Sequence, residues 1–190
     1  MKEIQRQIKT EYSDGFILIR PYREYDIDNL YEAARESINQ VYPWLPWCHP
    51  FYGIEESSDW IHSRSSAWED GKEYSFVIED AATGKFLGGT GINEINKTHN
   101  YGNLGYWVRS SATGRGVATG ATLLTAIFGF EQLLLQRLEI ISAVGNRASQ
   151  RVAGKAGAKK EGTLRRRLLI NGIHQDVNIY SLLPDDIHPR

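Results

Sequence analysis

A glycine-rich corner restricts the fold of this chain more than any other part of its sequence. The segment TGRGVATG, residues 113–120, joins a predicted strand ending in WVRS to a long apolar stretch, ATLLTAIFGFEQLLL. A helix starting near Arg115 would aim its free backbone N–H groups and the positive end of its dipole at one point. Since glycines allow a ligand to approach the backbone closely, the corner is typical of a site for an anion.

Known phosphate-binding motifs narrow the kind of anion. The nucleotide P-loop ends in Gly-Lys-Ser/Thr, which the chain lacks, so ATP hydrolysis is not expected. The dinucleotide fingerprint Gly-x-Gly-x-x-Gly also fails, because Ala118 and Thr119 follow the first two glycines at the wrong spacing. A pyrophosphate cradle of the acyl-coenzyme A type remains. Taken alone, the corner fits an ordinary strand-to-helix turn equally well.

The hydrophobic periodicity around the corner predicts an α/β (α+β) fold with a mixed sheet. Asn146 is expected to cap the last helix and Gly157 to end it, and Asn171-Gly172 favours a two-residue type I′ turn. The predicted strands are 16–22, 73–80, 85–95, 103–109, 137–144, 166–170 and 174–180, and the predicted helices are 26–40, 55–68, a helix from about 115, and 146–157. A strand-helix-strand unit implies one parallel pair of strands.

Composition limits the partners. The chain has 190 residues, 41% of them hydrophobic, which suits a single domain over 1–190. Its 22 basic and 23 acidic residues nearly cancel, so we expect neither a nucleic acid nor a membrane as partner. Cys48 is the single cysteine, which excludes an internal disulfide and a cysteine-based zinc cluster; we expect no metal and a packed thiol. Without a signal-like N-terminus, a cytoplasmic location is expected.

Three segments together resemble one family. GYWVRSSATGRGVATGATLL, NRASQRVAGKAGAKKEG and DVNIY are similar to the GNAT N-acetyltransferases, and within them to ribosomal-protein N-terminal acetyltransferases of the RimJ/RimL type. The resemblance covers nearly the whole chain. It implies the GNAT fold, a mixed, mostly antiparallel, twisted sheet of about seven strands with helices on both faces, and acetyl-CoA as the cofactor. The family's signature Gln/Arg-x-x-Gly-x-Gly/Ala falls on residues 113–118, where Thr113 departs from it.

The resemblance also implies roles for individual residues. The backbone of the corner would hold the pyrophosphate, and the strand around Val108 would pair with the pantetheine arm. Asn146 would contact the cofactor, and the Ser149 hydroxyl would protonate the departing thiolate. Asn146 could instead serve only as a helix cap, and Ser149 could be an ordinary hydroxyl in the first helical turn. The corner residues concerned are Gly114, Arg115, Gly116, Val117, Ala118 and Thr119.

The general base is the open question. In similar enzymes a glutamate precedes the GYW segment, or a carboxylate precedes LNG; here Asn103 and Leu168 occupy those positions. An asparagine can orient water but cannot accept a proton at neutral pH. We hypothesise Glu94 as the base, with His174, Asp176 or a water chain as alternatives. A solvated charge at the strand end is the competing interpretation of Glu94.

The kind of acceptor follows from pKa values and from one loop. An α-amine with a pKa near ~8 is roughly a tenth neutral at pH 7, whereas a lysine near ~10.4 is neutral less than about one part in a thousand. An N-terminal amine therefore needs less help from a base. In PWLPW, residues 43–47, Trp44 and Trp47 either wall an acceptor slot or plug the core between the first two helices. His174 is a further expected acceptor contact.

These observations predict an acetyl-CoA-dependent N-acetyltransferase. We expect the acceptor to be a protein N-terminus, such as that of a ribosomal protein, reached by direct attack in a ternary complex. A small amine, either a polyamine or an antibiotic, is the alternative acceptor, and a non-catalytic acyl-CoA sensor is the alternative function. The sequence leaves a homodimer open. The run Arg165–Arg167 is expected to be a solvated charge on a regular strand, with two guanidiniums on one face.

Overall fold

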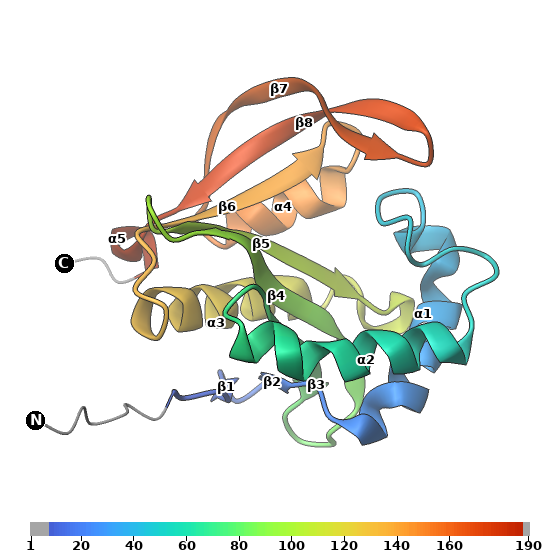
Figure 1. Ribbon diagram of the computed structural model, residues 1–190. Helices are drawn as coiled ribbons and strands as arrows, with labels where there is room; N and C mark the ends of the chain where they lie inside the picture. Colours follow the sequence, from blue (N-terminus) through green and yellow to red (C-terminus); the bar gives the residue numbers. More distant parts are fainter. Residues whose placement is uncertain (1–7, 188–190) are drawn as a thin grey trace, which may run out of the picture.

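The computed structural model describes residues 8–187, so the first seven and last three residues of the predicted domain 1–190 lie outside it. An eight-stranded sheet with the order β1-β2-β3-β4-β5-β6-β8-β7 forms its centre (Figure 1). The strands are β1 (Tyr12–Ser13), β2 (Ile17–Pro21), β3 (Tyr74–Asp80), β4 (Phe86–Asn96), β5 (Tyr101–Val108), β6 (Arg137–Ala143), β7 (Lys159–Ile170) and β8 (Ile173–Leu182). The helices are α1 (Ile27–Val41), α2 (Ile54–Glu69), α3 (Val117–Glu131), α4 (Arg147–Lys155) and α5 (Pro184–Ile187), with short 3₁₀ turns at Glu24–Asp26 and Ser110–Ala112.

The predicted mixed sheet with helices on both faces is confirmed. Helix α3 packs on one face of the sheet, and α1 and α2 cover the other (Figure 1). In β3, Phe76 belongs to the core cluster beneath α3, whereas its neighbour Val77 packs with α1 and α2. A strand buried on both sides needs a continuous apolar run, which β3 has. The seven expected strands are present, and the two-residue β1 makes the eighth.

Two local predictions agree with the structure and one is shifted. The side chain of Asn146 caps α4, because its Oδ1 accepts a hydrogen bond from the N–H of Ser149 at 3.1 Å. Asn171 and Gly172 both have positive φ, 48° and 77°, as a type I′ turn requires. Helix α3 begins two residues later than predicted, at Val117. Gly116 has a left-handed φ of 84° and therefore cannot belong to the right-handed helix.

The three consecutive arginines are exposed, as expected, but the expectation that they lie on a regular strand was wrong. Strand β7 bulges between the pairs Leu164–Val177 and Leu168–Gln175, so Arg165–Arg167 face only Asp176 on β8. The Arg166 N–H donates to Asp176 Oδ1 at 2.8 Å, and its φ is 51°. This irregular backbone interrupts the alternation of faces that a regular strand would have.

Strands β5 and β6 run parallel, and they separate almost at once. Their register covers only Tyr101–Asn103 against Arg137–Glu139. Beyond it β5 continues to Val108 beside β4, while β6 continues beside β8. From Leu104 onward, β5 therefore has one edge with no strand partner among the described residues. We call this opening the wedge.

Cys48 is buried, as expected, and its thiol donates a hydrogen bond to Ala34 O at 3.3 Å. Burial raises the pKa of this thiol to about 11, so it stays protonated.

None of the helices in residues 8–187 is long and apolar enough to cross a membrane.

Helix α1 holds the chain between β5 and the glycine corner in place. The Arg109 Nε donates to Glu36 Oε2 at 2.9 Å, and the other oxygen of Glu36 accepts the Ser111 N–H at 2.7 Å. The Ser110 N–H donates to Ser37 Oγ at 2.9 Å. The hydrogen bonds from Arg109 hold the pKa of Glu36 down at about 2.

Replacing Glu36 with Gln should destabilise the fold in a pH-dependent way. A carboxylate with a lowered pKa stabilises the fold above its ordinary value of 4.5, and this contribution is lost as the pH falls toward about 2. At pH 7 we expect a loss of about 1–2 kcal/mol in the free energy of unfolding. Urea unfolding of the wild type and Glu36→Gln at pH 7 and near pH 2.5 measures it.

Glu32→Gln is the matched control, because Glu32 is exposed on the same helix and its carboxylate has no hydrogen bond to the described residues. It should change the free energy of unfolding by less than about 0.5 kcal/mol. A deficit of Glu36→Gln that persists unchanged near pH 2.5 would contradict the assignment.

Candidate active site

The glycine corner presents a row of unpaired backbone N–H groups. Gly114 and Gly116 have φ of 75° and 84°, and a Cβ built on either would meet no atom within 4 Å. The first hydrogen bond into α3 runs from the Gly120 N–H to Gly116 O at 3.0 Å. Within residues 8–187, the N–H groups of Val117, Ala118 and Thr119 have no acceptor. An anion fits this arrangement of open space, free donors and a helix N-terminus.

Gly120 has a different role from the two glycines before it. A Cβ there would lie 3.0 Å from Asp14 Oδ2 and 3.1 Å from Ile17 Cδ1. Its missing side chain therefore allows α3 to pack closely against the start of β2. Only the first two glycines of the motif leave space for a ligand.

Tyr106 and Ser149 face each other across the wedge. The Tyr106 hydroxyl donates to Ser149 O at 3.0 Å and lies 3.1 Å from Ser149 Oγ. Burial raises the pKa of Tyr106 to about 12, so the phenol is protonated at neutral pH. The prediction included Ser149 but missed Tyr106. The alternation of faces in GYWV was the signal that could have found it.

Asn146 lies beside this pair at the start of α4. Its Oδ1 is engaged in the cap, while its Nδ2 has no acceptor in the part of the chain that the structure describes. The capping role and a ligand contact through Nδ2 are therefore compatible. The residues predicted to bind the cofactor lie on three parts of the structure that border the wedge. These parts are the N-terminus of α4, the unpaired edge of β5 up to Val108, and the glycine corner.

Asn103 lies at the closed end of the wedge. It is in register with Asn93 on β4 and with Glu139 on β6, and its Nδ2 donates to Asn93 Oδ1 at 2.8 Å. Glu139 is a carboxylate that the sequence analysis missed. Its Oε1 accepts from Arg137 Nε at 2.9 Å, so it is already engaged with a cation.

Glu94 and His174 are exposed. Glu94 occupies the bulge of β4 with a φ of 48°, and its side chain is 66% exposed. Its carboxylate lies 3.9 Å from the Arg167 guanidinium on the bulge of β7. His174 lies on β8, two residues beyond the type I′ turn, and its side chain forms no hydrogen bond or ion pair with the described residues. Neither residue lies among the free N–H groups of the glycine corner.

The PWLPW loop extends over the open end of the wedge from one strand to the other. A Cβ on Gly145, just after β6, would lie 3.3 Å from the Trp44 ring. The Trp47 ring packs edge-to-face on Trp107 of β5, with centroids 5.2 Å apart. Asn171, at the tip of the β7–β8 hairpin, donates from Nδ2 to Tyr42 O at 3.2 Å. Trp47 is 36% exposed, so it is not a simple core plug.

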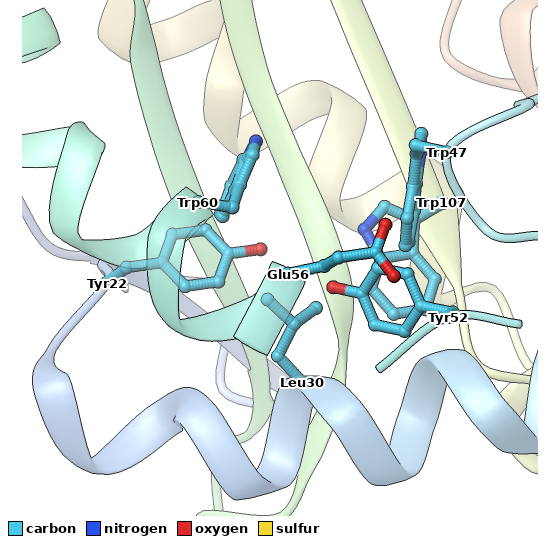
Figure 2. A pocket seen from close by; sticks show the side chains of 7 residues that line it. All are labelled: Tyr22, Leu30, Trp47, Tyr52, Glu56, Trp60 and Trp107. Atoms are coloured by element: carbon cyan, nitrogen blue, oxygen red, sulfur yellow. The ribbon is translucent and has the colours of Figure 1, made fainter. Parts of the chain in front are cut away.

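A cavity of about 300 Å³ lies next to this loop, between α1, α2 and β5 (Figure 2). We call it the aromatic pocket. Its lining contains no lysine, arginine or histidine, and Tyr22, Tyr52, Trp60 and Glu56 were not among the predicted site residues. The lining residues are Tyr22, Leu30, Trp47, Tyr52, Glu56, Trp60 and Trp107.

Comparisons with known proteins agree with this geometry. "Putative ribosomal N-acetyltransferase YdaF" of Bacillus subtilis is 29% identical over 172 residues, which cover 88% of this chain and 91% of that protein. The ribosomal-protein-serine acetyltransferase of Escherichia coli is 30% identical over 165 residues, covering 85% and 89%. Mycobacterium smegmatis RimJ, solved in complex with CoA-disulfide, superposes with a TM-score of 0.85 at 23% identity, covering 96% of this chain and 88% of that one.

A family model described as an acetyltransferase (GNAT) domain matches residues 17–159, from β2 to the start of β7. This span contains the corner, the wedge and the aromatic pocket. The chain therefore belongs to the GNAT acetyltransferase family, and it is an acetyl-CoA-dependent N-acetyltransferase.

Proposed function

We propose that this protein acts in the cytoplasm as a single acetyltransferase domain over residues 1–190 and acetylates the N-terminal α-amine of a protein. The wedge carries the proposal, because it combines an unpaired strand edge, free N–H donors at one end and a tryptophan loop over the opening. The names of the two relatives support a ribosomal protein as the acceptor. A small amine is the alternative acceptor.

The corner and the edge of β5 would hold the cofactor. The backbone N–H groups from Arg115 to Thr119 would bind the pyrophosphate, since they are free and lie at a helix N-terminus. The edge of β5 as far as Val108 would pair with the pantetheine arm as a neighbouring strand would. Asn146 would add its Nδ2. When bound, acetyl-CoA supplies an acetyl group activated as a thioester.

Ser149 and Tyr106 would deliver the proton to the leaving sulfur. The Ser149 hydroxyl is held by Tyr106 at the wedge, and Tyr106 stays a hydrogen-bond donor because its pKa is about 12. The hydroxyl donor and the N-terminus of α4 would stabilise negative charge on the sulfur. No protein nucleophile is needed, since the amine attacks the thioester directly.

On the acceptor side, Glu94 is the proposed base, and Asn103 would orient a water molecule toward it. Asn103 cannot take the proton itself, because an amide is not basic at neutral pH. Trp44 and Trp47 would wall the acceptor slot, and His174 would contact the acceptor from the hairpin. His174 and Asp176 remain the alternative bases.

Gly116→Ala tests the corner. A Cβ at φ 84° strains the backbone and projects into the space in front of the N–H groups, so the Kd for coenzyme A should rise at least about tenfold. Gly120→Ala is the matched control, and it should cost stability through Ile17 but leave this Kd within about threefold. Calorimetric titration with coenzyme A compares them. If adding coenzyme A does not shift the amide NMR signals of residues 108–119, the proposed function is refuted.

Ser149→Ala and Tyr106→Phe test the proton donor. Each removes one hydroxyl of a pair 3.1 Å apart, so kcat should fall about 10- to 100-fold with little change in the KM for acetyl-CoA. Ser149→Thr keeps a hydroxyl and should retain most of the activity. Steady-state thiol release measures all three. If Ser149→Ala turns over like the wild type, the hydroxyl only supports the structure of α4.

Glu94→Gln tests the base. Removing a base should lower kcat/KM for an N-terminal peptide at least about tenfold at pH 7, and less at pH 9, where the α-amine is already neutral. Glu139→Gln is the control, because the Glu139 carboxylate is occupied by Arg137. Wild-type turnover of Glu94→Gln at pH 7 would eliminate this residue as the base.

A further inference from the structure

The aromatic pocket is built from rings that meet nearly at right angles. Tyr22 and Trp60 form one corner, with centroids 4.7 Å apart and planes at 82°, and Trp47 and Trp107 form another at 5.2 Å and 71°. Figure 2 shows the rings around a shared space, with Leu30 of α1 below. Rings in this arrangement present both faces and edges to a bound group.

The pocket has hydroxyl and carboxylate oxygens beside the indole nitrogens of its tryptophans. The Tyr22 hydroxyl points into the space (Figure 2) and has no hydrogen-bond partner among residues 8–187. A Cβ on Gly89 would lie 2.4 Å from this hydroxyl and 2.8 Å from Trp107 Nε1, so glycine in β4 makes room for both side chains. The hydroxyl of this half-buried tyrosine is therefore free to form a hydrogen bond with a bound group.

Glu56 gives the rim a negative charge. Its Oε1 accepts the Gly53 N–H at 2.9 Å, and its Oε2 lies 2.9 Å from His49 Nε2. These contacts, the Gly53 bond first, lower its pKa, so the carboxylate is charged at neutral pH. Each oxygen can still accept another hydrogen bond. The Arg64 guanidinium lies 4.3 Å from the centroid of the Trp60 ring and forms an ion pair with Glu73 at 2.9 Å.

The pocket lies beside the site of acetyl transfer. Trp107 follows Tyr106 directly in β5, so the two side chains point to opposite faces of the strand. Tyr106 reaches Ser149 across the wedge, whereas Trp107 lines the pocket. Trp47, which lines the pocket, and Trp44, which lies against Gly145 just after β6, belong to the same loop. The pocket and the open end of the wedge therefore share the PWLPW loop as a border.

We propose that the aromatic pocket binds an alkylammonium or guanidinium group of the acceptor, separate from the amine that is acetylated. Aromatic faces, a rim carboxylate and a free hydroxyl oxygen all favour a cation, and no basic side chain in the lining opposes it. The volume of about 300 Å³ suits one group of side-chain size. A lysine or arginine side chain near a protein N-terminus and the distal ammonium of a polyamine share this chemistry. The assignment to the acceptor rests on the proposed function.

Binding can be tested without any acetyl transfer. Choline and its uncharged isostere 3,3-dimethylbutan-1-ol are titrated against the tryptophan fluorescence of the whole protein. Choline should bind at least tenfold more tightly than the isostere. Trp47→Leu and Glu56→Gln should each weaken choline binding about five- to tenfold. Phe51→Leu should leave it unchanged, since Phe51 is 89% exposed and outside the lining.

Two outcomes of the titration would overturn the inference. Equal binding of choline and the isostere would show that the pocket selects apolar groups. Absence of binding by either would show that the pocket is not a ligand site. The folded state of each variant is checked by its thermal unfolding midpoint, and Trp60 and Trp107 remain as fluorescence reporters in Trp47→Leu.

Acetylation kinetics identify the source of the cation. Peptides with Lys, Arg, norleucine or Glu at the second and third positions are compared with spermidine. The cationic peptides, or spermidine, should show a KM at least tenfold lower than the norleucine peptide, and Trp47→Leu should remove this difference without changing the KM for acetyl-CoA. Acetylation without a preference for cations would overturn the inference and leave the proposed function intact. Choline binding without acetylation of any acceptor would overturn the proposed function and leave the binding of a cation in the pocket intact.

Discussion

The brief parallel pairing of β5 and β6 is the constraint on which the rest of the site depends. The two strands share a register over three residues and then follow different partners, β5 with β4 and β6 with β8. The contacts of Arg109 and Ser111 with Glu36 tie the end of β5 to α1, while the end of β6 leads into the capped start of α4. Tyr106 and Ser149 connect the two sides. An unpaired strand edge and two helix N-termini are thus brought to one opening.

Neighbouring residues of β5 divide the chemistry between two faces of the sheet. Tyr106 faces α4 at the wedge, and Trp107 faces α1 and α2 and lines the aromatic pocket. Adjacent residues of a strand point in opposite directions, so one strand borders both the wedge and the pocket. The pocket extends toward α2, where Glu56 adds a carboxylate that the PWLPW segment lacks.

Local sequence signals predicted local geometry well. The cap by Asn146 and the Asn171-Gly172 turn depend on residues close in the chain, and both are present. Helix α3 starts later than periodicity suggests, because the left-handed Gly116 precedes it. The alternation predicted for Arg165–Arg167 failed because the β7 bulge depends on pairing with β8, which periodicity cannot show.

By itself, the sequence determined the positive-φ glycine corner, the helix caps, the order of strands and helices and the family, since each is expressed by residues near one another. Only the tertiary structure decided which residues meet. The partner of Tyr106 is 43 positions away, and the residues of the aromatic pocket extend from Tyr22 to Trp107. Such contacts are set by how both faces of the sheet are packed. Two glycines of TGRGVATG consequently border open space, whereas the third lies against Ile17 in the core.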